Sequence, residues 1–177
     1  MGALDDLKQF SAKIQLGYIL VAAILIQFVK GGAGVVQIQG ITPFWEANSQ
    51  WIEFGWAAIP LTAMYIFVVT KTMDTIDGID GLAAGIASIS AGTLSLIAVH
   101  SGQPRVALVC GAVAGAALGF LRHNYNPARI FMGTGGAQLF GFMLACLSIV
   151  GAVKTAAAIA LIVPILAFGV PVFDAFF

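Results

Sequence analysis

The feature that most constrains this chain is a series of six apolar runs, each 16 to 19 residues long, separated by more polar segments. A helix that spans a lipid bilayer needs about 20 predominantly apolar residues, so each run is a candidate span. The sequence therefore predicts an all-α polytopic membrane protein with about six transmembrane helices, in a single integral membrane domain over residues 1–177. The predicted spans cover residues 14–29, 54–70, 82–99, 106–121, 137–153 and 155–173.

The composition excludes the other broad classes of protein. Only 9% of the residues are charged and 60% are hydrophobic, whereas soluble domains carry about 25% charged residues. Disordered chains need the opposite balance of charge and hydrophobicity. The eight Lys and Arg residues are matched by eight Asp and Glu residues, so no basic surface is expected and no nucleic acid is a predicted partner. The lipid bilayer is the expected surrounding.

The segment between the first two spans is predicted to lie outside the bilayer. Its four glycines disfavour a helix, and residues 35–39 alternate enough for a short strand. We expect a short extracytoplasmic β-hairpin or an irregular loop at 31–50. Trp45, Trp51 and Trp56 flank the re-entry into the bilayer, as interfacial tryptophans do.

Counting the crossings places residues 1–13, 71–81 and 122–136 on one side of the membrane. This side holds five of the eight Lys and Arg residues, so the positive-inside rule predicts that it is cytoplasmic. Aspartates gathered at one membrane face from several helix ends predict a functional site there. All six aspartates of the chain fall on this side, namely Asp5, Asp6, Asp74, Asp77, Asp80 and Asp174.

The strongest single motif is the run of aspartates at positions 74, 77 and 80. At helical pitch, Asp74, Asp77 and Asp80 would form one stripe that repels itself unless a cation lies among the carboxylates. Gly78 and Gly81 would let a ligand approach the backbone. The alternative is N-capping of the next helix, which explains one or two of the aspartates. Three with interleaved glycines favour a site.

The loop at 122–136 combines cations and amide side chains with a glycine-rich turn that leads into a helix. Backbone N–H groups at a helix start favour an anion such as phosphate, and His123 and Arg129 would add positive charge. The alternative is a positive-inside anchor, which fits Arg122 better than it fits Arg129.

Asp5 and Asp6 add two adjacent carboxylates, which on their own are equally well explained as a solvated surface pair. Carboxylates repel phosphate, and a Mg²⁺ ion resolves this because it binds carboxylate and phosphate oxygens together. The residues therefore point to metal-assisted phosphate chemistry at a membrane face, on a substrate that the apolar helices hold.

Four motifs resemble those of the polyprenyl-phosphate N-acetylhexosamine-1-phosphate transferases of glycosyltransferase family 4. This family includes the phospho-MurNAc-pentapeptide transferases and the UDP-GlcNAc:undecaprenyl-phosphate GlcNAc-1-phosphate transferases. The motifs occur in the family's order and together cover essentially the whole chain. They are the aspartate-pair segment Gly2–Lys8, the D-G-x-D-G-L-A segment at Asp77–Gly85, the N-x-x-P-A and F-M-G segments within Asn124–Gly133, and P-x-x-D at Pro171–Asp174.

The resemblance implies a reaction, its partners and the role of each matching residue. Polyprenyl phosphate would attack a UDP-N-acetylhexosamine and release UMP, with Mg²⁺ as cofactor and Mn²⁺ as an alternative. The resemblance also implies a location in the bacterial cytoplasmic (inner) membrane, with the site facing the cytoplasm. The product would serve the synthesis of a cell-envelope glycan such as peptidoglycan, lipopolysaccharide or a teichoic acid linkage. A homodimer is consistent with the resemblance. The implied residues are Asp5, Asp6, Asp77 and Asp80 for catalysis, Lys8, Asp74, Asn124, Arg129, Gly133 and Gly135 for substrate binding, and Asp5, Asp6 and position Thr134 for the metal.

Three positions depart from the family pattern. Thr134 stands where the family has an aspartate that binds Mg²⁺, and a hydroxyl replaces a carboxylate poorly. Asp74 stands where an asparagine is usual, and Lys71 where another often occurs. The carboxylate at Asp74 would partly replace the one absent at 134 if the two positions were neighbours. We also expect that the chain is a fragment, inactive alone, with further spans before residue 1 and a cytoplasmic loop and further spans after residue 177.

Other functions stay open at the level of sequence. A transporter would place carboxylates inside its spans, and this chain has none at mid-span. A non-catalytic homologue that binds lipid phosphate or a nucleotide sugar is consistent with Thr134. A CDP-alcohol phosphotransferase needs a pattern, D-G-x-x-A-R with two later aspartates, that the chain lacks. A histidine-rich loop in the sequence after residue 177 would favour the enzyme.

Overall fold

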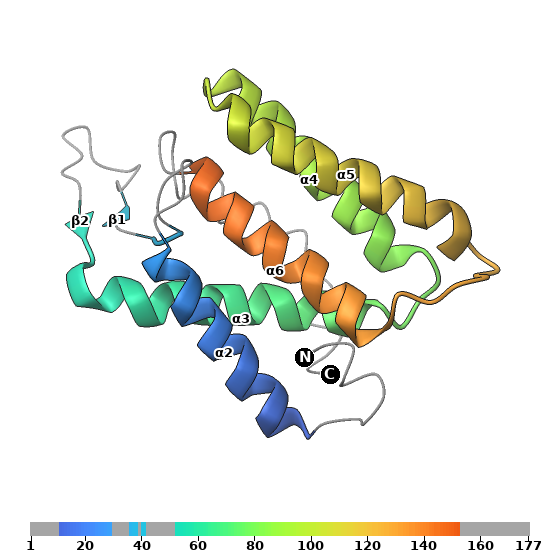
Figure 1. Ribbon diagram of the computed structural model, residues 1–177, viewed down its shortest axis with the longest axis horizontal. Coiled ribbons are helices and arrows are strands. Elements are labelled where there is room, and N and C mark those ends of the chain that lie inside the picture. The colour runs from blue at the N-terminus through green and yellow to red at the C-terminus, as the bar shows by residue number, and fades with distance from the viewer. Residues whose placement is uncertain (1–10, 30–35, 39, 42–51, 153–177) are drawn as a thin grey trace.

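The computed structural model describes residues 11–29, 36–38, 40–41 and 52–152, which fold as an all-helical bundle with one minimal strand pair (Figure 1). The apolar runs of the sequence form the helices. The elements are α2 (Ala12–Phe28), β1 (Gly40–Ile41), β2 (Ile52–Glu53), a 3-10 turn (Gly55–Ala57), α3 (Ala58–Ile76), α4 (Leu82–His100), α5 (Pro104–Asn124) and α6 (Gly133–Ala152).

Four helical segments of the described part are long and apolar enough to cross a membrane. They are Gly55–Ile76, Leu82–His100, Pro104–Asn124 and Gly133–Gly151. Helix α2 is apolar but shorter, with 17 residues. The sixth predicted span, 155–173, lies outside the described residues. The structure thus supports a multi-helix membrane protein, and four of the six predicted spans meet the length of a bilayer.

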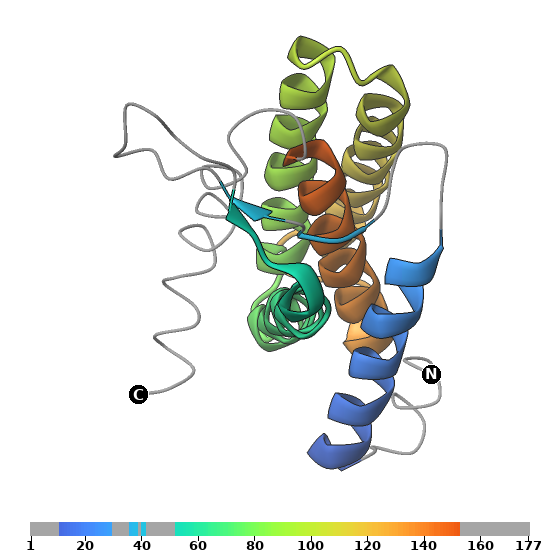
Figure 2. The same ribbon diagram turned by 90° about the vertical axis from the view of Figure 1, so that its left-hand side faces the viewer.

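The helices pack as an antiparallel pair, α4 with α5, against a second group in which α6 packs across α3. Figure 2, which views α3 nearly end-on, shows α2 on the side of this group away from α4 and α5. Small residues of α4 lie in the core of the bundle: Ala83, Ala87 and Ala91 recur every fourth residue and have no exposed surface. Such residues let two helix backbones approach closely, which is the usual way helices associate in lipid.

Helix α6 lies very close to α3 at Gly141. A Cβ atom at this position would lie 2.8 Å from Thr70 Cα and 3.0 Å from Met73 Cβ. Only glycine permits this crossing without moving one of the helices.

The predicted β-hairpin at 31–50 is not confirmed. β1 pairs antiparallel with β2, with Gly40 opposite Glu53 and Ile41 opposite Ile52. The residues between the two strands, 42–51, lie outside the described residues. The Ile38 N–H donates to Thr62 Oγ1 at 3.0 Å and ties the short described piece before β1 to helix α3.

Several helices extend beyond the spans predicted from the sequence. The second span was expected to end at Thr70, yet α3 continues to Ile76 because the first glycine after it is Gly78. Helix α5 starts at Pro104 and continues to Asn124. Proline is well suited to the first position of a helix, because a backbone N–H there would have no acceptor within the helix. The polar loop expected over 122–136 is therefore shortened to the residues between α5 and α6.

Candidate functional site

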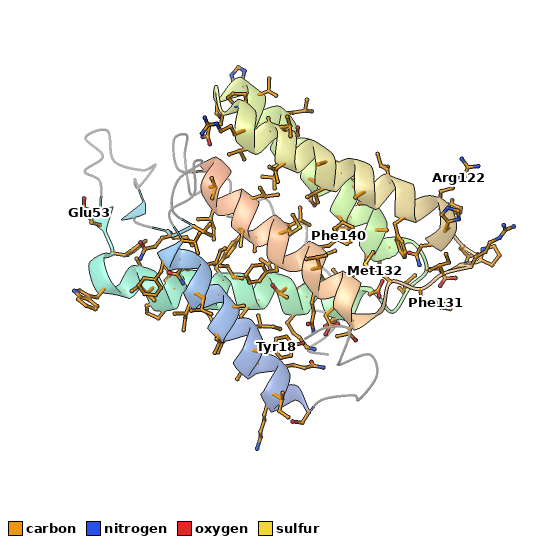
Figure 3. All side chains as sticks on the ribbon, in the orientation of Figure 1. Tyr18, Glu53, Arg122, Phe131, Met132 and Phe140 are labelled. Atoms are coloured by element: carbon orange, nitrogen blue, oxygen red, sulfur yellow. The ribbon has the colours of Figure 1, made fainter. Side chains whose placement is uncertain are left out.

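Five helix ends meet at one end of the bundle. They are the start of α2, the end of α3, the start of α4, the end of α5 and the start of α6. Figure 3 labels Arg122, Phe131 and Met132 at this end. The prediction that 71–81 and 122–136 share one side is confirmed as a shared end of the bundle. Residues 1–10, with the predicted site residues Asp5, Asp6 and Lys8, lie outside the described residues.

The α3–α4 turn does not carry the predicted helical stripe of aspartates. Asp74 lies in α3, Asp77 is the residue that ends this helix, and Asp80 lies in the turn that follows. The stripe was wrong because Gly78 and Gly81 interrupt the helix. Gly81 has φ +76°, a left-handed conformation that glycine adopts without strain. Asp77 and Asp80 are both half-buried here.

Asn124 joins the α3–α4 turn to the α5–α6 loop. It is 3% exposed, its side-chain oxygen accepts a hydrogen bond from the Gly81 N–H at 2.9 Å, and its Nδ2 donates to the Ile130 carbonyl at 2.9 Å. Both ends of the amide are thus engaged within the chain. The structure gives this predicted substrate-binding residue a positioning role.

Asp80 makes the second connection between the same two segments. The Ala128 N–H donates to Asp80 Oδ2 at 3.0 Å. The loop is also folded on itself, because the Arg129 N–H donates to the His123 carbonyl at 2.9 Å. Asp80 and Asn124 therefore hold the two segments that the D-G-x-D-G and N-x-x-P-A motifs occupy in one fixed arrangement.

Asp74 forms an ion pair with Lys71 of its own helix. Lys71 Nζ lies 2.5 Å from Asp74 Oδ2, an i,i+3 ion pair, and the Asp74 side chain is only 11% exposed. Lys71 Nζ also donates to Gln15 Oε1 of α2 at 2.8 Å. The two family departures at 71 and 74 thus pair with one another, and this ion pair weakens the idea that Asp74 replaces a carboxylate at 134.

The surface formed by the last turn of α5 and the α5–α6 loop combines cations with aromatic rings. Arg122, His123 and Arg129 are exposed, as are Tyr125 and Phe131, at 71% and 74%. This surface suits an anionic ligand that also carries a flat ring.

The glycine-rich segment opens a helix, as predicted. Gly133 has φ +70° and is the first residue of α6, so Thr134 and Gly135 lie in its first turn and are half-buried. The first amides of a helix favour an anion. Gly133, Thr134 and Gly135 thus lie where phosphate could meet backbone N–H groups.

The described residues do not by themselves form a metal site. Across residues 11–29 and 52–152, no group of three or more His, Cys, Asp and Glu side chains is placed to hold a metal ion. Asp77 and Asp80 supply the hard oxygen atoms that Mg²⁺ prefers, and Mg²⁺ is commonly held by one or two carboxylates together with phosphate oxygens and waters.

A group of polar residues inside the bundle was not predicted from the sequence. Gln15 and Tyr18 of α2 reach Lys71 of α3 and Gln138 of α6 respectively, and the Tyr18 hydroxyl donates to Gln138 Oε1 at 2.5 Å. The available signal was the spacing of Gln15 and Tyr18, three apart within an apolar run, which places them on one helix face.

Comparison with known proteins agrees with these motifs. The family model described as Glycosyl transferase family 4 matches residues 1–152. A probable undecaprenyl-phosphate N-acetylglucosaminyl 1-phosphate transferase of Bacillus subtilis (strain 168) is 34% identical over 177 residues, all of this chain and 48% of the relative. A phospho-N-acetylmuramoyl-pentapeptide-transferase of Bacillus thuringiensis (strain Al Hakam) is 42% identical over 97 residues, 55% of this chain and 30% of the relative.

The chain spans about half the length of the first of these relatives. The family match, in contrast, covers most of the chain, and the D-G-x-D-G and N-x-x-P-A motifs are brought together at one end of a helical membrane bundle. This protein belongs to glycosyl transferase family 4.

Proposed function

We propose that this chain is part of an enzyme that transfers a sugar 1-phosphate from a UDP-N-acetylhexosamine to polyprenyl phosphate, with release of UMP, in the synthesis of a cell-envelope glycan. The observation that carries the proposal is the connection of the Asp77–Gly81 turn to the 124–132 loop through Asn124 and Asp80. The names of the two relatives, both phosphosugar transferases, support it.

The proposed reaction is a displacement at phosphorus. An oxygen of polyprenyl phosphate forms a bond to the β-phosphorus of the nucleotide sugar, and the bond from that phosphorus to the oxygen of UMP breaks. A phosphate monoester has its second pKa near 6, so the attacking group is already largely ionised at neutral pH. We therefore propose that the enzyme contributes mainly by positioning and by stabilising charge, and less by a general base.

The proposed site has three parts, which would bind the metal ion, the nucleotide sugar and the lipid chain. Asp77 and Asp80, with Asp5 and Asp6, would hold Mg²⁺, or Mn²⁺ in its place, and the bound ion would neutralise the diphosphate oxygens. The exposed Arg129 and the first turn of α6, with Thr134 in place of the family's aspartate, would receive the nucleotide sugar. The lipid chain would lie along the apolar helices, where Ile89 and Leu108 are exposed at 72% and 74%.

The membrane arrangement completes the proposal. Six spans would include α2 and residues 155–173, and the end of the bundle that holds Asp77 and Asn124 would face the cytoplasm across the bacterial inner membrane. A homodimer is proposed on the basis of the family resemblance alone. Cysteines introduced at Gln9, Thr75 and Asn126 should react with a membrane-impermeant maleimide only in inverted vesicles. Reaction of Thr75→Cys from outside intact cells would overturn this orientation.

The catalytic proposal is tested by a paired substitution at Asp80 in the full-length protein. Asp80→Asn keeps an oxygen that accepts from the Ala128 N–H but removes the charge, whereas Asp80→Ala removes both. We expect both variants to lose UMP release from UDP-N-acetylglucosamine and undecaprenyl phosphate, while only Asp80→Ala lowers the melting temperature. Full activity in Asp80→Asn would show that the carboxylate serves the fold alone.

A second function has one specific observation in its favour. Thr134 in place of a carboxylate suits a homologue that binds a nucleotide sugar without turning it over. Binding of UDP-N-acetylglucosamine measured by calorimetry, with no release of UMP at any Mg²⁺ concentration, would favour this function over the transferase.

A further inference from the structure

Gln138 of α6 carries a buried hydrogen-bond donor that no described residue accepts. Its side chain is 6% exposed, and its Nε2 has no hydrogen-bond partner within the part of the chain that the structure describes. The large majority of buried side-chain polar atoms in proteins do have a partner, because a buried donor without an acceptor is destabilising. This N–H group is therefore a candidate contact for a bound molecule.

Tyr18 of α2 fixes the orientation of the Gln138 amide. The Tyr18 hydroxyl, labelled in Figure 3, donates to Gln138 Oε1 at 2.5 Å. The oxygen of an amide accepts hydrogen bonds and its nitrogen donates them, so this bond holds the oxygen toward α2 and directs Nε2 away from Tyr18. A donor that is fixed in advance loses little conformational freedom when a ligand binds to it.

Gln138 lies on the face of α6 that leads to the candidate site. Residues four apart share one face of a helix, so Gln138 lies one turn from Thr134, in the first turn of α6. Side chains of an α-helix lean toward its N-terminus. The amide of Gln138 therefore leans toward the turn where the proposed function places the nucleotide sugar.

The contact between α6 and α3 gives the same placement. Gly141, three residues after Gln138 on the same face, lies against Thr70 and Met73 of α3. From this crossing, α6 runs back to its first residue and α3 runs on to its last, at the same end of the bundle (Figure 1). Gln138 thus lies between the crossing and the candidate site.

Gln27 of α2 shows how a glutamine is accommodated for packing alone. It is also 6% exposed, but its Nε2 donates to the Ala23 carbonyl at 2.9 Å and to the Ile59 carbonyl of α3 at 3.3 Å. Only its Oε1 is without a described partner. The donor of Gln27 is therefore used within the bundle, whereas the donor of Gln138 is not.

The surroundings of Gln138 favour an uncharged acceptor. Lys71 Nζ donates to Gln15, which shares a helix face with Tyr18 three residues later, so Lys71 lies near this part of α2. Lys71 is paired with Asp74, and the pair has no net charge. Phosphate is held best by charged groups and by the first amides of a helix. A neutral amide donor instead suits a carbonyl oxygen.

A UDP-N-acetylhexosamine carries such an oxygen near its phosphates, because its acetamido group is on the carbon next to the anomeric carbon. We infer that Gln138 is a specificity-determining residue, whose Nε2 donates to the acetamido carbonyl of the sugar while Tyr18 holds the amide in place. The inference rests on the proposed transferase function and names the part of the substrate that this residue reads. A site with such a donor rejects an analogue that leaves the donor unpaired.

The test compares UDP-N-acetylglucosamine with UDP-glucose, which has a hydroxyl in place of the acetamido group. For each nucleotide sugar, calorimetry gives the Kd and UMP release with undecaprenyl phosphate gives kcat/KM, both in the full-length protein. Gln138→Met removes the donor at similar volume, and Tyr18→Phe releases the amide but keeps the donor. Gln27→Met is the matched control, because Gln27 is equally buried and its donor is used within the bundle.

We expect the wild type to prefer UDP-N-acetylglucosamine. Gln138→Met should reduce this preference about 3- to 10-fold, as expected for one neutral hydrogen bond, and Tyr18→Phe should reduce it less. Gln27→Met should lower the melting temperature and leave the preference unchanged. If Gln138→Met does not fold, the preference of Tyr18→Phe decides.

The outcomes distinguish this inference from the proposed function. An unchanged preference in folded Gln138→Met would overturn the inference, and a lower melting temperature alone would show that Gln138 serves the fold or a buried water. An equal loss of affinity for both nucleotide sugars would overturn it in favour of a contact with the shared UDP group. If the wild type binds both but releases no UMP, the proposed function fails, and the ratio of the two Kd values still decides the role of Gln138.

Discussion

The side chain of Asn124 accepts a hydrogen bond from the backbone N–H of Gly81 at 2.9 Å, across 43 residues of sequence. Asn124 is the last residue of α5 and Gly81 directly precedes α4. The other end of the same amide donates to the Ile130 carbonyl. One buried side chain therefore fixes three backbone segments at the end of the bundle where the family motifs meet.

Replacing Asn124 by leucine should destabilise the protein and abolish transferase activity together. The Gly81 N–H and the Ile130 carbonyl would lose their partners, and each of these part-buried hydrogen bonds contributes roughly 0.5–1.5 kcal/mol. Thermal unfolding in detergent and UMP release are the measurements. Asn126→Ala, at an exposed position of the same loop, is the matched control and should change neither.

Asn124→Asp separates the two bonds. The new carboxylate can still accept from the Gly81 N–H, but it has no N–H to donate to the Ile130 carbonyl. The melting temperature of the Asn124→Asp variant should therefore lie between those of the wild type and Asn124→Leu. A variant Asn124→Leu with wild-type stability would contradict the positioning role that the hydrogen bonds indicate.

Gly81→Ala should be destabilising, whereas Gly85→Ala should not. At φ +76° an alanine costs about 1–2 kcal/mol, and its Cβ would also lie 3.3 Å from Leu121 Cδ1. Gly85 lies within helix α4 with no atom within 4 Å of an added Cβ, so alanine there should stabilise by about 0.5–1 kcal/mol. Unfolding midpoints of the two variants check the contrast, and equal midpoints would refute it.

Gly141→Ala should separate α6 from α3. The added methyl would lie 2.8 Å from Thr70 Cα, and overpacking of this kind typically costs about 1–3 kcal/mol. Gly92→Ala, with open space around its Cβ position, is the control. Melting temperatures in the same detergent measure both, and a Gly141→Ala variant as stable as Gly92→Ala would show that the two helices do not cross at this glycine.

Thr134→Asp should lower the Mg²⁺ concentration that the transferase needs, because a carboxylate is a better ligand than a hydroxyl. Asp74→Asn should leave the Mg²⁺ requirement unchanged, because Asp74 is paired with Lys71. The measurement is the rate of UMP release against Mg²⁺ concentration. If the wild type and Thr134→Asp reach full activity at the same concentration, position 134 is no metal ligand. A raised requirement in Asp74→Asn would restore the idea that this carboxylate compensates.

Sequence periodicity and apolar length were enough to locate the helices but not their ends. The run at 54–70 was correct as a span, yet α3 extends through Lys71 and Asp74, since no helix-breaking residue precedes Gly78. Polar residues at a helix end look like loop residues in a sequence, although their ion pair stabilises one more turn. The aspartate stripe was wrong for the related reason that the glycines end the helix within it.

The candidate site was predicted in part. The motifs around Asp77 and Asn124 were expected at one membrane face, and the structure brings them together. The positioning role of Asn124 and the pairing of Lys71 with Asp74 were not predicted, because they depend on which atoms face one another. The assignments of Asp5, Asp6 and Lys8 remain predictions.

The sequence by itself determined that this chain is a helical membrane protein, because the length of an apolar run and the cost of placing a charge in lipid are properties of the residues alone. Only the tertiary structure decided the partners of the polar side chains. Gln15 finds Lys71 across 56 residues and Tyr18 finds Gln138 across 120. A hydrogen bond acts over about 3 Å, so its partner is chosen by how the helices pack, and no local pattern in the sequence encodes that choice.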